Sequence, residues 1–268
     1  MSGSVIHSQS AAMVPAVYSA GQSPQLPVVI DYPAALALRQ MSMVHDELPK
    51  YLLAPEVSAL LHYVPDLRRK MLLATLWNTG ARINEALALT RGDFSLAPPY
   101  PFVQLATLKQ RTEKTARTAG RSPAGKQTHR LVPLSDAWYV RQLQTMVATL
   151  KIPMERRNRR TGRTEKVRIW EVTDRTVRTW IGEAVAAAAA DGVTFSVLVT
   201  PHTFRHSYAM HMLYAGIPLK VLQSLMGHKS ISSTEVYTKV FALDVAARHR
   251  VQFAMPESDA VSMLKRIP

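Results

Sequence analysis

The chain has 268 residues, 47% of them hydrophobic, so it can bury a core of its own, and an intrinsically disordered class is excluded. It contains no cysteine, which excludes a disulfide framework, a thiol nucleophile and a cysteine-based metal cluster. The longest apolar run, Ala184 to Ala190, is far short of the roughly 18 residues that cross a bilayer. The first residues do not resemble a signal peptide. We therefore expect a cytoplasmic protein with no membrane partner.

The charge balance points to a nucleic-acid partner. Lys and Arg outnumber Asp and Glu by 33 to 19, and the net charge of +14 attracts polyanions. Two stretches, 109–130 and 151–168, each carry a net charge of +6. Solvated loops also carry such runs, but two of them in one chain favour contact with phosphates. The predicted DNA-binding residues are Arg111, Lys114, Lys126, Arg157 and Arg160.

The first part of the chain predicts an arm followed by a helical region. Residues 1–45 contain two charged side chains and several prolines, which predicts a flexible arm of low charge; residues 46–268 form the domain. Apolar spacing and proline positions then predict three helices. The first has Pro55 in its first turn, the second runs from Pro65 to Gly80, and the third covers 82–89.

The pattern changes in the middle of the chain. Phe102–Leu108 and Arg130–Leu134 read as strands, and they predict an antiparallel hairpin with a long charged connection. Ser135 and Thr173 are predicted to cap the next two helices. We therefore expect a mainly α fold with a small antiparallel β-sheet, of the α+β class.

The last hundred residues are again predicted to be helical. Pro201 and Pro218 stand at helix starts, and Gly216 and Gly227 stand at helix ends. The final segment, Pro256 to Ile267, is amphipathic and predicts one more helix.

One predicted helix carries both a proton donor and a permanent cation. It begins with the segment Thr200-Pro201-His202-Thr203-Phe204-Arg205-His206. His202 and Arg205 are three residues apart, so they project from the same face. His202 and His206 have the spacing of metal ligands, but no carboxylate lies in that helix, so we expect no metal site. Alone, a His-x-x-Arg pattern also fits a core histidine beside a surface arginine.

The order and spacing of other segments make the His-x-x-Arg pattern more specific. Thr79-Gly80-Ala81-Arg82-Ile83-Asn84-Glu85 puts an arginine just after a helix-ending glycine, and Gly227-His228 follows another helix end. Tyr237 comes nine residues after His228. In this order and spacing, the segments resemble the catalytic domain of the tyrosine recombinases, the phage-integrase family, from about Leu53 to Val240.

The resemblance implies a role for each of these side chains. Tyr237 would attack a DNA phosphodiester and form a 3′-phosphotyrosyl bond, Arg82 and Arg205 would hold the non-bridging oxygens, and His202 and His228 would donate hydrogen bonds or move protons. Two forked guanidiniums suit the charge that builds up on phosphate oxygens, so no metal or other cofactor is implied. Glu85 would support the site. Lys109 best matches the family's hairpin lysine, which protonates the departing 5′-oxygen, but the long connection also contains Lys114 and Lys126, and the sequence does not decide which of the three takes that role.

The resemblance also implies a biological setting. Family members form a tetramer on double-stranded DNA and exchange strands within it. We therefore expect a homo-oligomer on DNA in which the segment 256–268 contacts a neighbouring subunit. The short arm is similar to that of compact plasmid resolvases or inversion enzymes, and resolution of plasmid multimers in a bacterial cell is the preferred role. Relaxation of DNA by a type IB topoisomerase-like reaction and DNA binding without catalysis remain alternatives.

Overall fold

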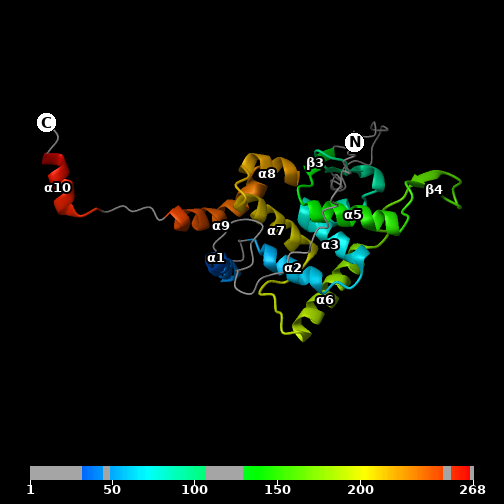
Figure 1. The fold of residues 1–268 in the computed structure, drawn as a ribbon, viewed down its shortest axis with the longest axis horizontal. Helices are drawn as coiled ribbons and strands as arrows, with labels where there is room; N and C mark the ends of the chain where they lie inside the picture. The colour runs from blue at the N-terminus through cyan, green and yellow to red at the C-terminus, as the bar shows by residue number, and fades with distance from the viewer. Residues whose placement is uncertain (1–31, 45–48, 107–128, 250–254, 266–268) are drawn as a thin grey trace, which may run out of the picture.

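The computed structural model describes residues 32–44, 49–106, 129–249 and 255–265 (Figure 1). Within these ranges helices predominate, and two small antiparallel sheets accompany them, which confirms the predicted α+β class. None of the helices in these ranges combines the length and apolar character needed to span a membrane.

The first helices of the domain match the predicted ones: α2 (Ala54–His62), α3 (Leu67–Thr79) and α4 (Ile83–Leu87). The carboxylate of Asp66 caps the start of α3, and Gly80 ends it with a φ of 58°. A Cβ at Gly80 would lie 2.3 Å from Cδ1 of Tyr208, so both the backbone angle and the close approach require glycine there.

The main sheet has the order β1-β2-β3, and all its pairs are antiparallel. Its strands are β1 (Phe94–Ser95), which follows the short 3-10 helix η1 (Arg91–Asp93), β2 (Phe102–Ala106) and β3 (His129–Pro133). Val103 pairs with Val132, and Leu105 pairs with Arg130; all four side chains are buried. Because side chains alternate along a strand, Arg130 shares the inward face of β3 with Val132.

Two further helices follow: α5 (Ala137–Thr149), which packs against α3, and α6 (Asp174–Ala190), which packs against α2 and α4. The prediction that Ser135 caps α5 was wrong, because Asp136 is the cap and its carboxylate accepts from the backbone N–H groups of Trp138 and Tyr139. The predicted cap at Thr173 is confirmed, since its hydroxyl accepts from the N–H of Thr176. Aspartate is as good an N-cap as serine, and only the position of the first turn distinguishes the two.

The second basic stretch contains a hairpin that the sequence pattern did not predict, formed by β4 (Glu155–Arg157) and β5 (Thr164–Lys166). Every residue of both strands is exposed. A strand exposed on both faces has no apolar alternation, so periodicity cannot reveal it. In Figure 1, β4 projects from the body of the molecule.

The last four helices are α7 (Pro201–Tyr214), α8 (Leu219–Met226), α9 (Ser232–His249) and α10 (Glu257–Lys265). Helix α7 is central, because it packs against α3, α8 and α9. Its buried residues join two apolar clusters, one around α3 and the sheet, the other around α8 and the start of α9. Figure 1 shows α9 leading away from the body and α10 lying apart from it.

The final part of the segment predicted as an arm is helical. It forms α1 (Tyr32–Val44), which lies against α9. The buried guanidinium of Arg39 forms an ion pair with Glu56 and donates to the hydroxyl of Ser196 across 2.6 Å. These contacts attach α1 to the domain, while residues 1–31 and 45–48 lie outside the described residues.

Candidate active site

Arg205 lies between the ends of two helices. Its Nη1 donates to the carbonyl oxygen of Gly80, at the end of α3, across 2.5 Å, and its Nη2 donates to that of Met226, at the end of α8, across 2.6 Å. The carbonyl ends of helices carry partial negative charge and favour a cation. Burial, followed by the charges of Arg82 and Arg130, lowers the pKa of Arg205 to about 10, so the guanidinium stays charged at neutral pH.

Glu85 holds two arginines on either side of its carboxylate. Its side chain is 1% exposed, and its Oε1 accepts from Nη1 of Arg82 across 2.9 Å. Arg130 binds it through two bonds, of 2.6 Å from Nη2 and 3.1 Å from Nη1. Burial opposes the negative charge, but the bonds from Arg130 and then Arg82 outweigh it and keep the pKa of Glu85 below its ordinary value. Glu85 therefore orients both guanidiniums.

Arg130 also connects this ion-pair network to the end of α8. Its Nε donates to the carbonyl oxygen of Leu225 across 2.8 Å. Gly227 has a φ of 63°, and a Cβ there would lie 3.0 Å from Nη1 of Arg130. Sequence reasoning counted Arg130 in a basic run and as the start of a predicted strand, but gave it no role in the site. The available signal was its alternation with Val132 and Leu134, which places all three on one face of that strand.

His228 follows directly after this turn. Its Nδ1 lies 2.8 Å from Oγ1 of Thr234, which fixes the ring. Burial, and then the charges of Arg205, Arg82 and Arg130, lower the pKa of His228 to about 4. The ring is therefore neutral at physiological pH, and it can present one N–H donor to a ligand.

Tyr237 is buried on the first turns of α9, and its hydroxyl points toward α7. The hydroxyl oxygen lies 2.9 Å from Nδ1 of His206. Burial raises the pKa of Tyr237 to about 12, although the charges of Arg205 and Arg82 act in the opposite direction. The phenol is thus protonated in the free protein and lies within electrostatic range of both guanidiniums.

Sequence reasoning weighed His206 only as a metal ligand and missed this contact. His202, by contrast, is exposed, and its ring lies 4.3 Å from that of His206, centroid to centroid. Its exposure is only partial, and the loss of solvation, followed by the charges of Arg205, Arg82 and Arg178, lowers the pKa of His202. Among the residues that the structure describes, no group of three or more His, Cys, Asp or Glu side chains could hold a metal ion.

The fold thus gathers five predicted site residues into one cluster, which we call the arginine–tyrosine cluster: Arg82, His202, Arg205, His228 and Tyr237. Lys109, Arg111, Lys114 and Lys126 lie outside the described residues. Arg157 and Arg160 are exposed on the β4–β5 hairpin, which projects from the body of the molecule (Figure 1). The catalytic roles assigned to these side chains stay predictions.

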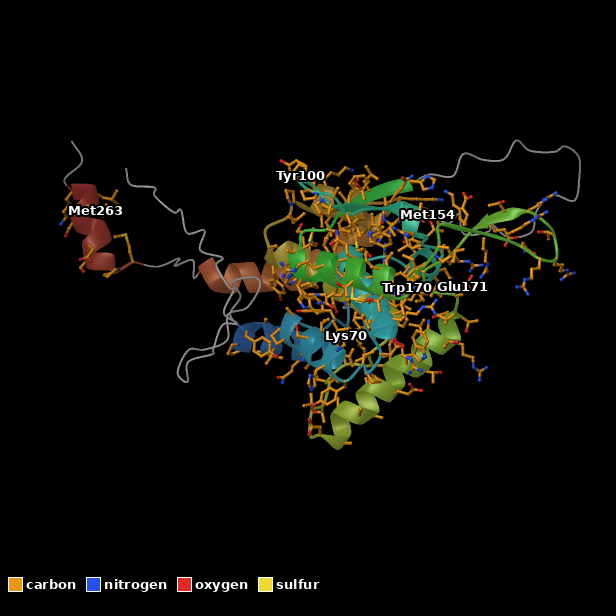
Figure 2. The ribbon with its side chains drawn as sticks, turned by 45° about the vertical axis from the view of Figure 1, so that its right-hand side comes forward. Lys70, Tyr100, Met154, Trp170, Glu171 and Met263 are labelled. Atoms are coloured by element: carbon orange, nitrogen blue, oxygen red, sulfur yellow. The ribbon has the colours of Figure 1, made fainter. Side chains whose placement is uncertain are left out.

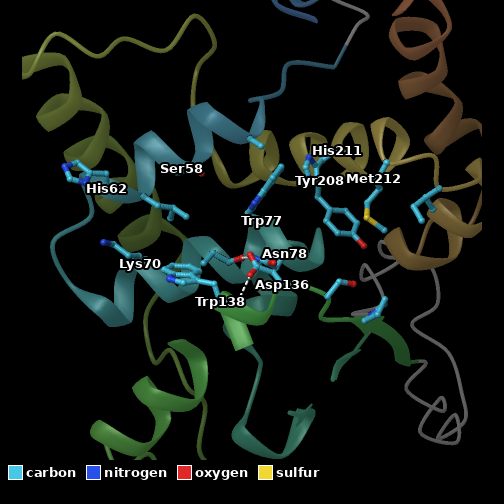
Figure 3. Close-up of a pocket in the computed structure, with 17 residues that line it drawn as sticks. Ser58, His62, Lys70, Trp77, Asn78, Asp136, Trp138, Tyr208, His211 and Met212 are labelled. Atoms are coloured by element: carbon cyan, nitrogen blue, oxygen red, sulfur yellow. Dashed lines mark hydrogen bonds between the residues drawn. The ribbon is translucent and has the colours of Figure 1, made fainter. Parts of the chain in front are cut away.

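A separate cavity of about 890 Å³ lies between α2, α3, α5 and α7. Its walls include Ser58, Trp77, Trp138, His211 and Met212 (Figure 3). Tyr208, whose ring covers Gly80, also lines it, but no member of the arginine–tyrosine cluster does.

The comparisons with known proteins agree with this geometry. The model of the phage integrase family matches residues 50–243. The chain therefore belongs to the phage integrase family and is a site-specific tyrosine recombinase.

The names of individual relatives are more specific than the family description. It is 94% identical over 267 residues to a resolvase of Escherichia coli K12, with 100% of each chain covered. It is 48% identical over 239 residues to a probable site-specific recombinase in the afa region of E. coli, covering 89% of this chain and 90% of that protein. The tyrosine recombinase XerD of Mycobacterium leprae is 32% identical, with 72% and 57% covered.

Solved structures share the fold. The XerA recombinase superposes with a TM-score of 0.54 at 18% identity, covering 82% of this chain and 77% of that one. The XerH recombinase in a post-cleavage complex with a palindromic difH substrate gives a TM-score of 0.53 at 18% identity, covering 76% and 53%.

Proposed function

We propose that this recombinase is a resolvase that breaks and rejoins double-stranded DNA through a 3′-phosphotyrosyl bond at Tyr237, and that it resolves plasmid multimers inside the bacterial cell. One observation carries the mechanism: Tyr237 is buried, and its hydroxyl lies within electrostatic range of the charged Arg205 and Arg82. The near-identical relative named as a resolvase supports the role.

The two guanidiniums would stabilise the transition state. Attack on a phosphodiester spreads negative charge over the equatorial oxygens, and fixed cationic donors stabilise that charge. Arg205 is held rigidly by two helix ends, and Arg82 is exposed while its carboxylate partner Glu85 is buried. Arg82 is therefore open to an incoming phosphate, and Arg205 forms the floor of the site.

Proton movement would complete the reaction. His202 and His228 are both neutral at physiological pH, because their pKa values are lowered chiefly by burial, so they would donate hydrogen bonds to the phosphate. Lys109 would protonate the departing 5′-oxygen, as the family resemblance implies. The phosphotyrosyl bond keeps the energy of the broken linkage, so another 5′-hydroxyl can reseal the strand without ATP.

The β4–β5 hairpin would contribute contacts with DNA phosphates. Arg157 and Arg160 are exposed there, and the ion pair of Arg156 with Glu171, at 2.6 Å, braces its base. Figure 2 shows Met154 and Glu171 where the hairpin leaves the body. Contacts of this kind would add affinity without sequence preference.

Helix α10 is suited to contact a neighbouring subunit of a tetramer on DNA. Val261, Met263 and Leu264 are 50%, 61% and 72% exposed. Deleting residues 256–268 should reduce recombination of a two-site plasmid by about 10-fold or more while changing DNA affinity little, because lost contacts between subunits weaken assembly and not phosphate binding. Equal losses in both measurements would contradict this assignment.

A suicide DNA substrate tests the mechanism. A nick beside the cleavage site releases a short 5′-hydroxyl strand and traps the covalent adduct. Tyr237→Phe should abolish the adduct and leave DNA binding intact, because only the attacking oxygen is lost. Tyr63→Phe, which removes an exposed hydroxyl bonded to Asp191, is the matched control and should form the adduct normally.

Each alternative gives a different result. Binding without any adduct in the wild type would indicate a non-catalytic DNA-binding protein. Relaxation of supercoils without exchange between two sites would indicate a topoisomerase-like enzyme. Conversion of plasmid dimers to monomers would support the role in multimer resolution.

A further inference from the structure

His206 touches the atom that would carry out the attack. Its Nδ1 lies 2.9 Å from the hydroxyl oxygen of Tyr237, a normal hydrogen-bond distance, and the two ring centroids are 5.5 Å apart. Among the residues that the structure describes, His206 is the hydrogen-bond partner of the Tyr237 hydroxyl. The contact joins α7 to α9, so it places the phenol oxygen relative to Arg205, the residue before His206.

The surroundings of His206 keep its ring neutral. It is half-buried, and the groups that face it are His202 and Arg205 on α7, His228 after α8 and Tyr237 on α9. Burial, and then the charges of His202, Arg205 and His228, lower the pKa of His206 to about 3. A neutral imidazole has one nitrogen with a free lone pair, which can accept a hydrogen bond and then a proton.

Resting on the function proposed above, we propose that His206 is a catalytic residue that orients the Tyr237 hydroxyl and accepts its proton during attack. The hydroxyl donates to Nδ1, and the hydrogen of the neutral ring is on Nε2. As the bond between the phenol oxygen and phosphorus forms, the O–H bond breaks and the proton moves to Nδ1. The bond between phosphorus and the 5′-oxygen breaks, and that oxygen takes a proton from a separate donor.

Bound DNA would make this transfer easier. In the free protein, burial and then the positive charge of Arg205 disfavour a second proton on the His206 ring, so the phenol of Tyr237 stays protonated. A phosphodiester brings a negative charge among Arg205, Arg82 and His228. That charge offsets the nearby cations and favours a protonated His206. The proton would therefore leave Tyr237 when the scissile phosphate is in place.

Single-turnover cleavage of the suicide substrate, with enzyme in saturating excess, tests the proposal. His206→Ala and His206→Gln should each lower the cleavage rate by about 100-fold or more, the usual contribution of a general base. Glutamine can still bind the hydroxyl but cannot take its proton. His211→Ala is the matched control, because His211 lies on the same helix but lines the separate cavity beside Trp77 (Figure 3), and it should cleave normally.

The pH profile separates proton transfer from positioning. With His206 present, the rate should depend far less steeply on pH between about pH 6 and 8 than in the variants, because the phenol passes its proton to the ring and not to solvent. In both variants the rate should rise nearly tenfold per pH unit, because the phenol, with a pKa of about 12, must lose its proton to solvent before it attacks. A fluorinated tyrosine at position 237, whose phenol is more acidic, should partly restore the alanine variant.

Other outcomes would overturn the proposal. A wild-type rate and a flat profile in His206→Gln would show that His206 only positions the phenol. Faster cleavage by His206→Ala would show that the contact restrains the tyrosine. An adduct that persists in Tyr237→Phe would instead refute the proposed function, whatever the His206 variants do.

Discussion

Replacing Glu85 with glutamine is expected to lower the free energy of unfolding by about 3–5 kcal/mol, the usual effect of breaking a buried ion pair. Glu85 and Arg130 are 1% and 7% exposed, and their closest atoms are 2.6 Å apart. The variant would leave the Arg130 guanidinium buried without an opposing charge. Urea unfolding, followed by circular dichroism, measures the change.

The chain offers a matched control for this loss. Arg156 and Glu171 are also 2.6 Å apart, but their side chains are 53% and 40% exposed. Glu171→Gln should cost under about 1 kcal/mol, because solvent screens an exposed pair. If the two variants lose similar amounts, the burial of the Glu85 network does not matter and the expectation is wrong.

The same pair predicts a pH dependence. The pKa of Glu85 is lower in the folded protein than its ordinary value of 4.5. A lowered folded pKa means that the contribution to stability is complete above the unfolded value and is lost as the pH falls through the folded one. The stability difference between the wild type and Glu85→Gln should therefore shrink in acid, below about pH 4.5.

Arg205→Lys is expected to reduce DNA cleavage by about 10³-fold or more, in line with the loss of a charge-stabilising arginine in phosphoryl transfer. Lysine keeps the charge but cannot reach two fixed acceptors with one planar fork. The Arg205 fork now binds Gly80 and Met226 at the ends of two helices. Single-turnover cleavage measures the rate, and gel-shift titration measures DNA affinity.

Arg68→Lys controls for the structural part of that loss. Arg68 donates to the carbonyl oxygen of Ile169 from Nε and Nη2, across 3.2 and 2.7 Å, outside the arginine–tyrosine cluster. It should cleave DNA at the wild-type rate. A loss below about 10-fold for Arg205→Lys, in a protein that is still folded, would remove Arg205 from the proposed chemistry.

The local sequence determined much of the fold, and it identified the five residues of the arginine–tyrosine cluster. Gly80 and Gly227 end their helices because each needs a left-handed backbone, and Pro201 starts α7 because a first-turn proline loses no hydrogen bond. The spacing of His202 and Arg205 placed them together on one helix. Such features depend on neighbours a few residues away, so a sequence pattern can reveal them.

Only the tertiary structure decided which distant groups meet. Arg130 binds Glu85, 45 residues away, and His206 binds Tyr237, 31 residues away. Periodicity shows that a side chain faces inward but not what it meets there, because that partner depends on how whole elements pack. The same reason explains why α1 was predicted as part of an arm: its contacts with Glu56 and Ser196 come from elements far along the chain.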